Sequence, residues 1–282
     1  MTLLLDPRQR AMLAEMGVRT DFLPAVSSDV PAAGASAEVA PAKVHRSETR
    51  HQPATPQAPS SPSAHPLASL AASAVSEMDW DALAQSVREC QACGLCKTRK
   101  NTVFGVGAPA AGPGLAPRAD WLIVGEAPGE NEDLQGEPFV GQAGRLLDNM
   151  LKALGLSRQA QGAPEASVYI LNVLKCRPPG NRNPQPEELL QCAPFLERQV
   201  ALLQPKIIVA MGRFAMQSLL KDTVPQVESM PLGKLRGQIY SYRGIPVVVT
   251  YHPAYLLRSL TEKAKAWADL CLALSRARRP QD

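Results

Sequence analysis

Four cysteines stand in two widely separated pairs whose spacing could bind a metal centre. The pairs are Cys90 with Cys93 and Cys176 with Cys192. Thiolates brought together from distant segments suit zinc or an iron-sulfur cluster. The second pair directly follows an apolar run, residues 168–174, in which Asn172 is the single polar side chain. A metal ligand thus lies four residues from a polar group, and the pattern predicts a metal cluster that braces a pocket.

The even total of six cysteines also permits a disulfide framework, which is typical of secreted proteins. The apolar N-terminal stretch is too short for a signal-peptide core and is broken by Asp6 and Pro7. No apolar run approaches the ~20 residues of a membrane span. We therefore expect a cytoplasmic protein with reduced cysteines and no membrane partner. Cys96 extends the C-x-x-C series and is an alternative metal ligand.

Composition divides the chain into three parts. Residues 1–22 contain a proline-initiated apolar pattern that predicts a short helix, which could dock on a protein partner or could equally be a frayed end. Residues 23–76 lack aromatic side chains and are rich in Ala, Pro and Ser, a composition typical of a disordered linker. Residues 77–282 should form the folded domain.

Charge and histidine are also unevenly distributed. Residues 1–80 hold six Lys/Arg and eight Asp/Glu, whereas the remainder holds 24 Lys/Arg and 18 Asp/Glu. This basic excess suits a nucleic-acid partner. Three of the four histidines fall in the linker, so His252 is the one imidazole of the predicted domain.

Short β-branched runs alternate with helical patterns throughout the predicted domain. Strands are expected at 121–124, 168–174, 207–211 and 246–250, and helices at 80–87, 143–154, 186–203, 214–220 and 263–276. This order predicts an α/β fold, a three-layer α/β/α arrangement around a central, mostly parallel four-stranded sheet. Ligands of such folds bind beyond the carboxyl ends of the strands. The loops to inspect therefore begin at Gly125, Cys176, Gly212 and Tyr251.

Two of these loops carry distinctive residues. The glycine-rich turn after the first strand is followed by acidic residues that would repel phosphate, and it lacks the known phosphate-binding motifs, which argues against a nucleotide site. The last strand leads to His252 and a proline turn with Tyr255, Leu256, Leu257 and Arg258. Apolar tips beside a base often act as wedges in DNA-binding proteins.

Four segments resemble the motifs of family 4 uracil-DNA glycosylases, which are iron-sulfur enzymes. They read VGEAPGENED, FVGQAG, YILNVLKCRPPGNRNP and HPAYLLR, and the resemblance covers roughly residues 85–275. It implies a uracil-DNA glycosylase-like fold and a nucleoid-associated monomer that starts base excision repair on uracil-containing DNA, single- or double-stranded. It also implies a structural [4Fe-4S] cluster on Cys90, Cys93, Cys176 and Cys192, which leaves Cys96 spare.

The resemblance and the chemistry of base recognition together suggest roles for several residues. A flipped uracil must be recognised on its Watson–Crick edge, and the amide of Asn172 can accept from N3–H and donate to O4. Phe139 matches the stacking platform, and Gly125 and Ala127 are further uracil-binding candidates. His252 matches the donor that stabilises the developing charge on O2.

Water activation is less determined, because Ala127 stands where other uracil glycosylases carry an aspartate. Glu126 and Glu132 are the candidates, and by resemblance Glu132 could instead exclude the thymine methyl group. DNA contacts are expected from Arg177, Arg182, Lys175, Arg213 and Arg258, with Leu256 or Leu257 as wedge and Tyr255 as the alternative. Two other functions stay open: a non-catalytic iron-sulfur protein that binds uracil-containing DNA, and a zinc-stabilised glycosylase for another damaged base such as hypoxanthine.

Overall fold

The computed structural model describes residues 74–110, 112–160 and 163–278. They form three layers, a central sheet with helices on each of its two faces. The strands are β1 (Trp121–Gly125), β2 (Val168–Asn172), β3 (Ile207–Met211), β4 (Ile239–Tyr242) and β5 (Ile245–Thr250). Their order in the sheet is β2-β1-β3-β5-β4. All neighbouring pairs are parallel except β4 with β5. The predicted α/β fold is confirmed, but the sheet has five strands instead of four.

The strand missed by the sequence analysis is β4, an edge strand. It forms a hairpin with β5 through Arg243 and Gly244, both of which have positive φ angles of 50° and 83°. A two-residue turn in which both residues have positive φ angles matches the right-handed twist of the two strands that it connects. Because three of its four side chains are at least partly exposed, β4 lacks the apolar run that marks the other strands.

Helices cover both faces of the sheet. They are α3 (Trp80–Glu89), α4 (Glu130–Gln135), α5 (Gln142–Ala153), α6 (Pro186–Leu203), α7 (Arg213–Leu220), α8 (Leu232–Leu235), α9 (Pro253–Arg258) and α10 (Lys263–Ala277). Short 3-10 turns are η1 (Gly94–Lys97), η2 (Pro164–Ala166), η3 (Pro179–Asn181), η4 (Val227–Ser229) and η5 (Leu260–Glu262).

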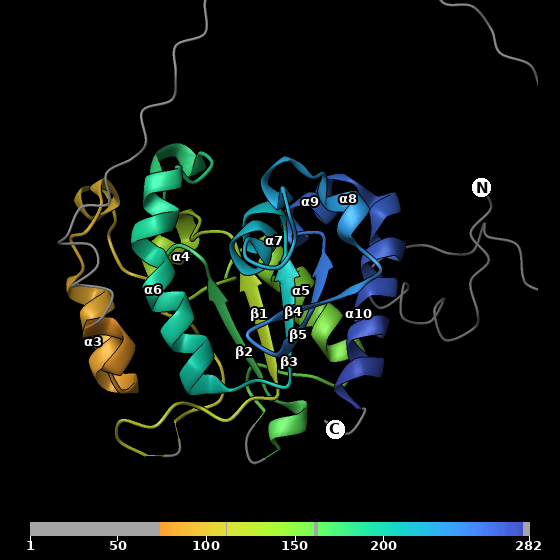
Figure 1. Ribbon diagram of the computed structural model, residues 1–282, viewed down its shortest axis with the longest axis horizontal. Coiled ribbons are helices and arrows are strands. Elements are labelled where there is room, and N and C mark those ends of the chain that lie inside the picture. Colours follow the sequence, from red (N-terminus) through yellow and green to blue (C-terminus); the bar gives the residue numbers. More distant parts are fainter. Residues whose placement is uncertain (1–73, 111, 161–162, 279–282) are drawn as a thin grey trace, which may run out of the picture.

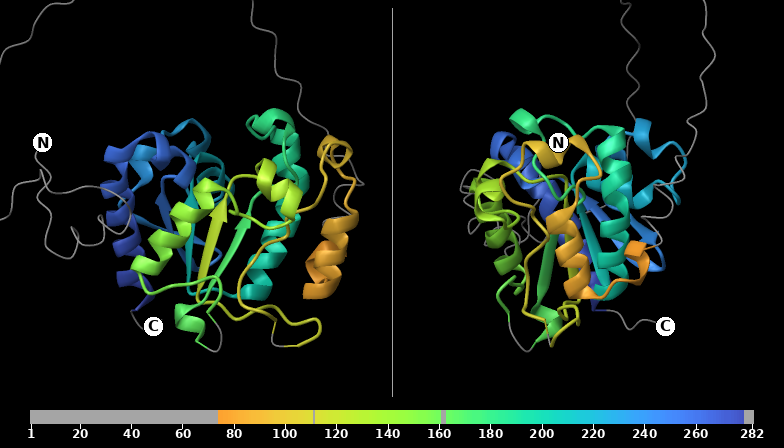
Figure 2. Two further views of the ribbon diagram at one scale, coloured as in Figure 1. Left: turned by 180° about the vertical axis from the view of Figure 1, so that it is seen from behind. Right: turned by 90° about the vertical axis from the view of Figure 1, so that its left-hand side faces the viewer.

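Two apolar cores separate the layers. One joins alternate strand residues such as Ile123 and Val209 to α5, α9 and α10, and the other joins Leu122 and Ile208 to α6 and α7. Successive strand residues therefore point into opposite cores, as the two-residue period of a strand requires. Figure 2 shows the sheet between α5 on one side and α6 on the other.

Local signals fix the ends of the helices that frame the site. The helix α3 begins after Asp79, whose carboxylate accepts from the Ala82 amide at 2.8 Å. Pro186 opens α6 behind a capping box formed by Gln185 and Glu188. Figure 1 shows α3 beside α6, at the far side of the sheet from α10. A third apolar cluster fills the space between α3 and α6.

The predicted N-terminal helix and most of the predicted linker lie outside the described residues. Residues 74–77 are helical and Val75 is buried, so packed structure begins slightly before the expected boundary at residue 77. Within the described ranges, no helix has the length and apolar character needed to cross a bilayer.

Candidate active site

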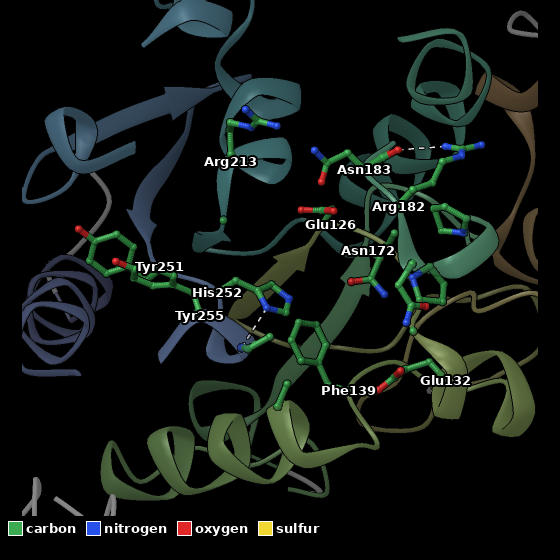
Figure 3. Close-up of a pocket in the computed structure, with 18 of the residues that line it drawn as sticks. Glu126, Glu132, Phe139, Asn172, Arg182, Asn183, Arg213, Tyr251, His252 and Tyr255 are labelled. Atoms are coloured by element: carbon green, nitrogen blue, oxygen red, sulfur yellow. Dashed lines mark hydrogen bonds between the residues drawn. The ribbon is translucent and has the colours of Figure 1, made fainter. Parts of the chain in front are cut away.

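A cavity of about 780 Å³ opens at the carboxyl ends of the parallel strands. Its lining includes a residue at or just after each of these strand ends: Glu126, Asn172, Gly212 and His252. Figure 3 shows that Glu126, Phe139, Asn172 and His252 come from separate elements and lie around the centre of this cavity. The structure thus has a cavity beyond the strand ends, which is where ligands bind in this architecture.

Asn172 forms part of the cavity floor at the end of β2. Its side chain is only 2% exposed, and its Oδ1 has no hydrogen-bond partner among the described residues. A buried polar atom without a partner is costly. Because Asn172 also lines the cavity, its amide is available to pair with a donor on a molecule that enters.

Gly125 lets two side chains approach the end of β1. A Cβ atom at this position would lie 2.4 Å from Oδ1 of Asn172 and 2.7 Å from Cζ of Phe139. Any larger residue would displace the amide, the ring or both. Gly125 is paired with Asn172 in the sheet register, so the pairing of β1 with β2 places the Asn172 amide beside Gly125.

Phe139 supplies an aromatic wall. Its ring stacks on the His252 imidazole with 5.2 Å between centroids and 27° between planes. The side chain is 5% exposed, and its backbone has a φ angle of 56°, which is uncommon for a bulky residue. The two stacked rings and the unpartnered amide line one part of the cavity, called the slot below, which presents apolar and polar surface to a flat heterocycle.

His252 is held as a neutral imidazole. It caps α9, and its Nδ1 accepts a hydrogen bond of 3.2 Å from the Ala254 amide. An accepting Nδ1 leaves the single proton on Nε2, which makes Nε2 a donor. Burial lowers the pKa of His252 to about 4, although Glu132 acts in the opposite direction. The imidazole is therefore uncharged at neutral pH.

The two glutamates expected near the site occupy different environments. Burial raises the pKa of Glu126, Arg213 opposes that shift, and Glu126 lines the cavity. Glu132 also lines the cavity, but its Oε1 accepts backbone hydrogen bonds from Val140 at 3.0 Å and Gly141 at 3.2 Å. One oxygen of Glu132 is therefore committed to the chain, whereas Glu126 is the better placed to act on a ligand.

Basic residues surround the rim of the cavity. Arg182, Arg213 and Arg258 are among the lining residues. Arg182 makes a bidentate ion pair with Glu188, and Arg213 lies over the Phe214 ring. Arg177 lies nearby on the same segment and bonds to Asn181 at 2.8 Å. Three of the four arginines predicted as DNA contacts thus line the cavity, whereas Arg177 does not.

The proline turn after β5 is a helix, and this changes one expectation. Tyr255 and Leu257 are each 39% exposed, but Leu256 is 0% exposed and packs in the core with α5 and α10. The prediction of an exposed Leu256 was wrong, because α9 places it one turn from the buried Pro253 on the inner face. Tyr255 lines the cavity and packs on Tyr251.

Five cysteines line a second, smaller cavity between α3, η1, the segment after β2 and α6. They are Cys90, Cys93, Cys96, Cys176 and Cys192, and all five are free thiols. Apolar side chains including Val87 and Phe195 complete the wall, and Arg99 donates to Sγ of Cys176 at 3.2 Å. Among the described residues, no group of three His, Cys, Asp or Glu side chains has single-ion geometry.

Lys175 lies in this cavity wall and is not a DNA contact. Its side chain is 1% exposed, and its Nζ donates to the Asn172 carbonyl oxygen at 2.6 Å. Burial lowers the pKa of Lys175 to about 7, and Cys192 and Cys176 oppose that shift. A buried cation normally needs anionic neighbours. The thiols beside it can supply that charge when they are ionised as metal ligands.

Some lining residues were given no role from the sequence. Asn183, Leu232 and Tyr251 also face the cavity. Tyr251 directly precedes His252, so its place at a strand end was available as a signal. Leu232 belongs to α8, a four-residue helix whose position nothing in the local sequence indicates.

Comparisons with known proteins agree with this geometry. The family model of the uracil DNA glycosylase superfamily matches residues 113–271. A type-4 uracil-DNA glycosylase of Saccharolobus solfataricus is 43% identical over 182 residues, which cover 63% of this chain and 76% of that protein. Another, from Thermotoga maritima, is 38% identical over 65% of this chain and 85% of its own. A type-5 uracil-DNA glycosylase of Thermus thermophilus is 33% identical over 51% and 73% respectively.

Proposed function

The chain belongs to the uracil DNA glycosylase superfamily, and we propose that it excises uracil from DNA by hydrolysing the N-glycosidic bond, the first step of base excision repair. The observation that carries this proposal is the unpartnered Oδ1 of Asn172 at the floor of an aromatic slot. Relatives that are 38–43% identical are named type-4 uracil-DNA glycosylases, which supports uracil as the substrate base.

Recognition depends on the Watson–Crick edge of a base that has left the helix. Oδ1 of Asn172 accepts from uracil N3–H, and its Nδ2 donates to O4. Cytosine has no proton at N3 and carries an amino group at C4, so the same amide would face mismatched groups. Sites that leave buried polar groups unpaired can reject an analogue by about 10⁴-fold. Phe139 stacks on the base, Ala127 lines the same cavity, and Gly125 leaves room for the Phe139 ring and the Asn172 amide.

Bond cleavage separates a cation-like sugar from an anionic base. The C1′–N1 bond breaks with its electron pair remaining on uracil, and the charge spreads to O2. The Nε2–H of His252 donates to O2, and such a preorganised donor is worth roughly 3–4 kcal/mol in comparable sites. Because the imidazole is neutral, it stabilises the anion as a dipole.

Water completes the reaction at C1′. We assign its orientation and deprotonation to Glu126, whose carboxylate lines the cavity and whose pKa burial raises above its usual value. A base with a raised pKa accepts a proton more readily. The water oxygen bonds to C1′, and its proton passes to Glu126.

DNA is held at the rim of the cavity. Arg177, Arg182, Arg213 and Arg258 suit phosphate contacts, which position the duplex without reading its sequence. Tyr255 and Leu257 are the exposed tips of α9 and fit the role of a wedge that fills the vacated stack. A protein that acts on DNA in this way would be located at the nucleoid.

The cysteine cavity fits a [4Fe-4S] cluster held by Cys90, Cys93, Cys176 and Cys192. Support comes from thiols of three segments around one cavity and from the buried ammonium of Lys175 beside them, which an anionic centre would neutralise. Such a cluster would cross-link α3, the segment after β2 and α6, and it would take no part in the hydrolysis. Cys96 lines the same cavity and is the spare thiol.

The test is release of free uracil from an end-labelled oligonucleotide by the purified, anaerobically handled protein. Wild type should release uracil, and variants Asn172→Ala and His252→Ala should release it at least about 100-fold more slowly. Binding of the uracil-containing strand without release of base would refute hydrolysis and favour the non-catalytic alternative.

A further inference from the structure

The stacking ring of the slot sits on an unusual backbone. Phe139 adopts a φ angle of 56°, in the left-handed region that bulky side chains rarely occupy. Conformations of this kind persist only where the surrounding structure holds them, and they cluster at functional sites. The contacts around residues 138–141 therefore identify what holds the ring in place.

Two charged side chains bind the backbone of residues 138–141, one at each end of the segment. Arg158 donates from Nη1 to the Pro138 carbonyl at 2.9 Å and from Nη2 to the Phe139 carbonyl at 3.3 Å. Glu132 accepts the amides of Val140 at 3.0 Å and Gly141 at 3.2 Å. Each of four consecutive residues thus has one backbone group bonded to a charged side chain.

The guanidinium of Arg158 is held in place by an ion pair with α5. Its Nε donates to Oδ1 of Asp148 on α5 at 2.8 Å, and the Arg158 side chain is 11% exposed. The Phe139 carbonyl also lies against α5 so closely that a Cβ atom on Gly144 would be 1.7 Å from its oxygen. Arg158 is not among the residues lining the cavity. Arg158 therefore does not contact a molecule in the cavity directly, and its hydrogen bonds to Pro138 and Phe139 connect it to the cavity wall.

We propose that Arg158 and Glu132 are positioning residues that form a clamp on Phe139 and hold its ring in the base slot. The clamp rests on the proposed function and gives Glu132 a role other than water activation. A planar guanidinium with two parallel donors suits adjacent carbonyls, and lysine cannot reproduce this geometry.

The test is a double-mutant cycle read by binding instead of turnover. The probe is a DNA oligonucleotide with one 2′-fluoro-2′-deoxyuridine, whose glycosidic bond resists cleavage, and the reference is the same strand with thymidine. Arg158→Met is expected to weaken binding of the probe about tenfold, leave binding of the reference unchanged, and have no further effect in a Phe139→Ala background. Arg158→Lys, a milder change, should give a smaller loss with the same dependence on Phe139.

A matched control separates the clamp from general charge. Arg145→Met removes an exposed arginine of α5 outside the cavity and should leave the preference for the probe unchanged. Glu132→Gln keeps an acceptor oxygen and should bind the probe more tightly than Glu132→Ala.

Two results would overturn the clamp. Equal losses from Arg158→Met with and without Phe139 would make Arg158 a general structural residue. Slow uracil release by Glu132→Gln with unchanged probe binding would show that Glu132 acts in the hydrolysis, as in water activation, and does not position Phe139. If wild type shows no preference for the probe over the reference, the proposed function fails together with the clamp, whereas additive effects in a wild type with that preference remove the clamp alone.

Discussion

The ammonium of Lys175 donates a hydrogen bond of 2.6 Å to the backbone carbonyl oxygen of Asn172. Lys175 lines the cysteine cavity, and Asn172 lines the larger cavity at the strand ends. One buried side chain therefore joins the wall of the cysteine cavity to the residue proposed to recognise the base. Disturbance at either cavity can reach the other through this bond.

Replacing Lys175 with Met should lower the retained metal. The substitution keeps most of the volume but removes the cation beside Cys176 and Cys192, and the loss of one partner from a buried charged pair costs about 3–5 kcal/mol. Iron and acid-labile sulfide per chain and the Tm should both fall. The exposed Lys152 of α5 provides the matched control, since Lys152→Met should change neither quantity. Full metal content in Lys175→Met would contradict the charge argument.

The proposed ligands and the spare thiol should respond differently to substitution. Cys176→Ser places a poorer ligand in a buried position and should abolish most of the iron and sulfide content, with a large fall in Tm. Cys96→Ser should retain both. Iron analysis and visible absorption of anaerobically purified variants provide the measurement. Loss of the metal in Cys96→Ser would show that the ligand set had been assigned incorrectly.

Replacing Asn172 with Leu should separate activity from stability. The leucine side chain has a similar volume but no polar atoms, so uracil release should slow by at least about 100-fold. Because Oδ1 is buried without a partner, its removal should leave the Tm unchanged or raise it. Thermal unfolding without DNA, measured beside the uracil-release assay, checks both parts. A marked fall in Tm would mean that Asn172 has a structural role.

The lowered pKa of His252 should make stability depend on pH. Burial lowers its pKa from 6.5 to about 4, so between these values the unfolded chain binds a proton that the folded chain does not. The resulting contribution is fully present above about pH 6.5 and is lost as the pH falls toward 4. Urea unfolding of wild type and His252→Gln at pH 7 and pH 5 isolates this effect. The stability difference between the two proteins should shift toward the variant at pH 5, and a constant difference would contradict the buried neutral imidazole.

Glu126 should control the acid limb of the rate profile. As a base it must be deprotonated, and burial raises its pKa above 4.5, so kcat should fall as the pH drops through that raised value. Glu126→Gln should lower kcat by about 10²–10⁴-fold with little change in KM. Steady-state rates across the pH range test this. An unchanged kcat would assign water activation elsewhere.

The elements that could be predicted were those with strong local signals. Residues 186–203 form α6 with the predicted bounds, because a proline and a glutamine–glutamate capping pair mark its start. The strand 207–211 was also predicted with its correct bounds, since its five residues form a continuous apolar run. All five are buried in the structure. Most cavity residues followed from these strands, because their carboxyl ends must meet on one edge of the sheet.

Features set by tertiary contacts were not predictable. The six residues of α9 carry too little pattern to fix its rotation, so the burial of Leu256 could not be separated from the exposure of Leu257. Lysine is usually exposed, and only the fold places Lys175 among thiols. Arg158 lies 19 residues from Phe139 in the chain, and nothing in its neighbourhood marks it as a partner of that loop.

The left-handed backbone of Phe139 has a consequence for how quickly DNA can be searched. The ring, the amide and the imidazole are arranged before any base arrives, so the protein has little to reorder when a nucleotide enters. Each encounter is then governed by how readily that nucleotide leaves its own stack, which is easiest at weak or mismatched pairs. A rigid slot therefore lets unsuitable bases return quickly to the duplex, and the time spent per nucleotide stays short along a long molecule.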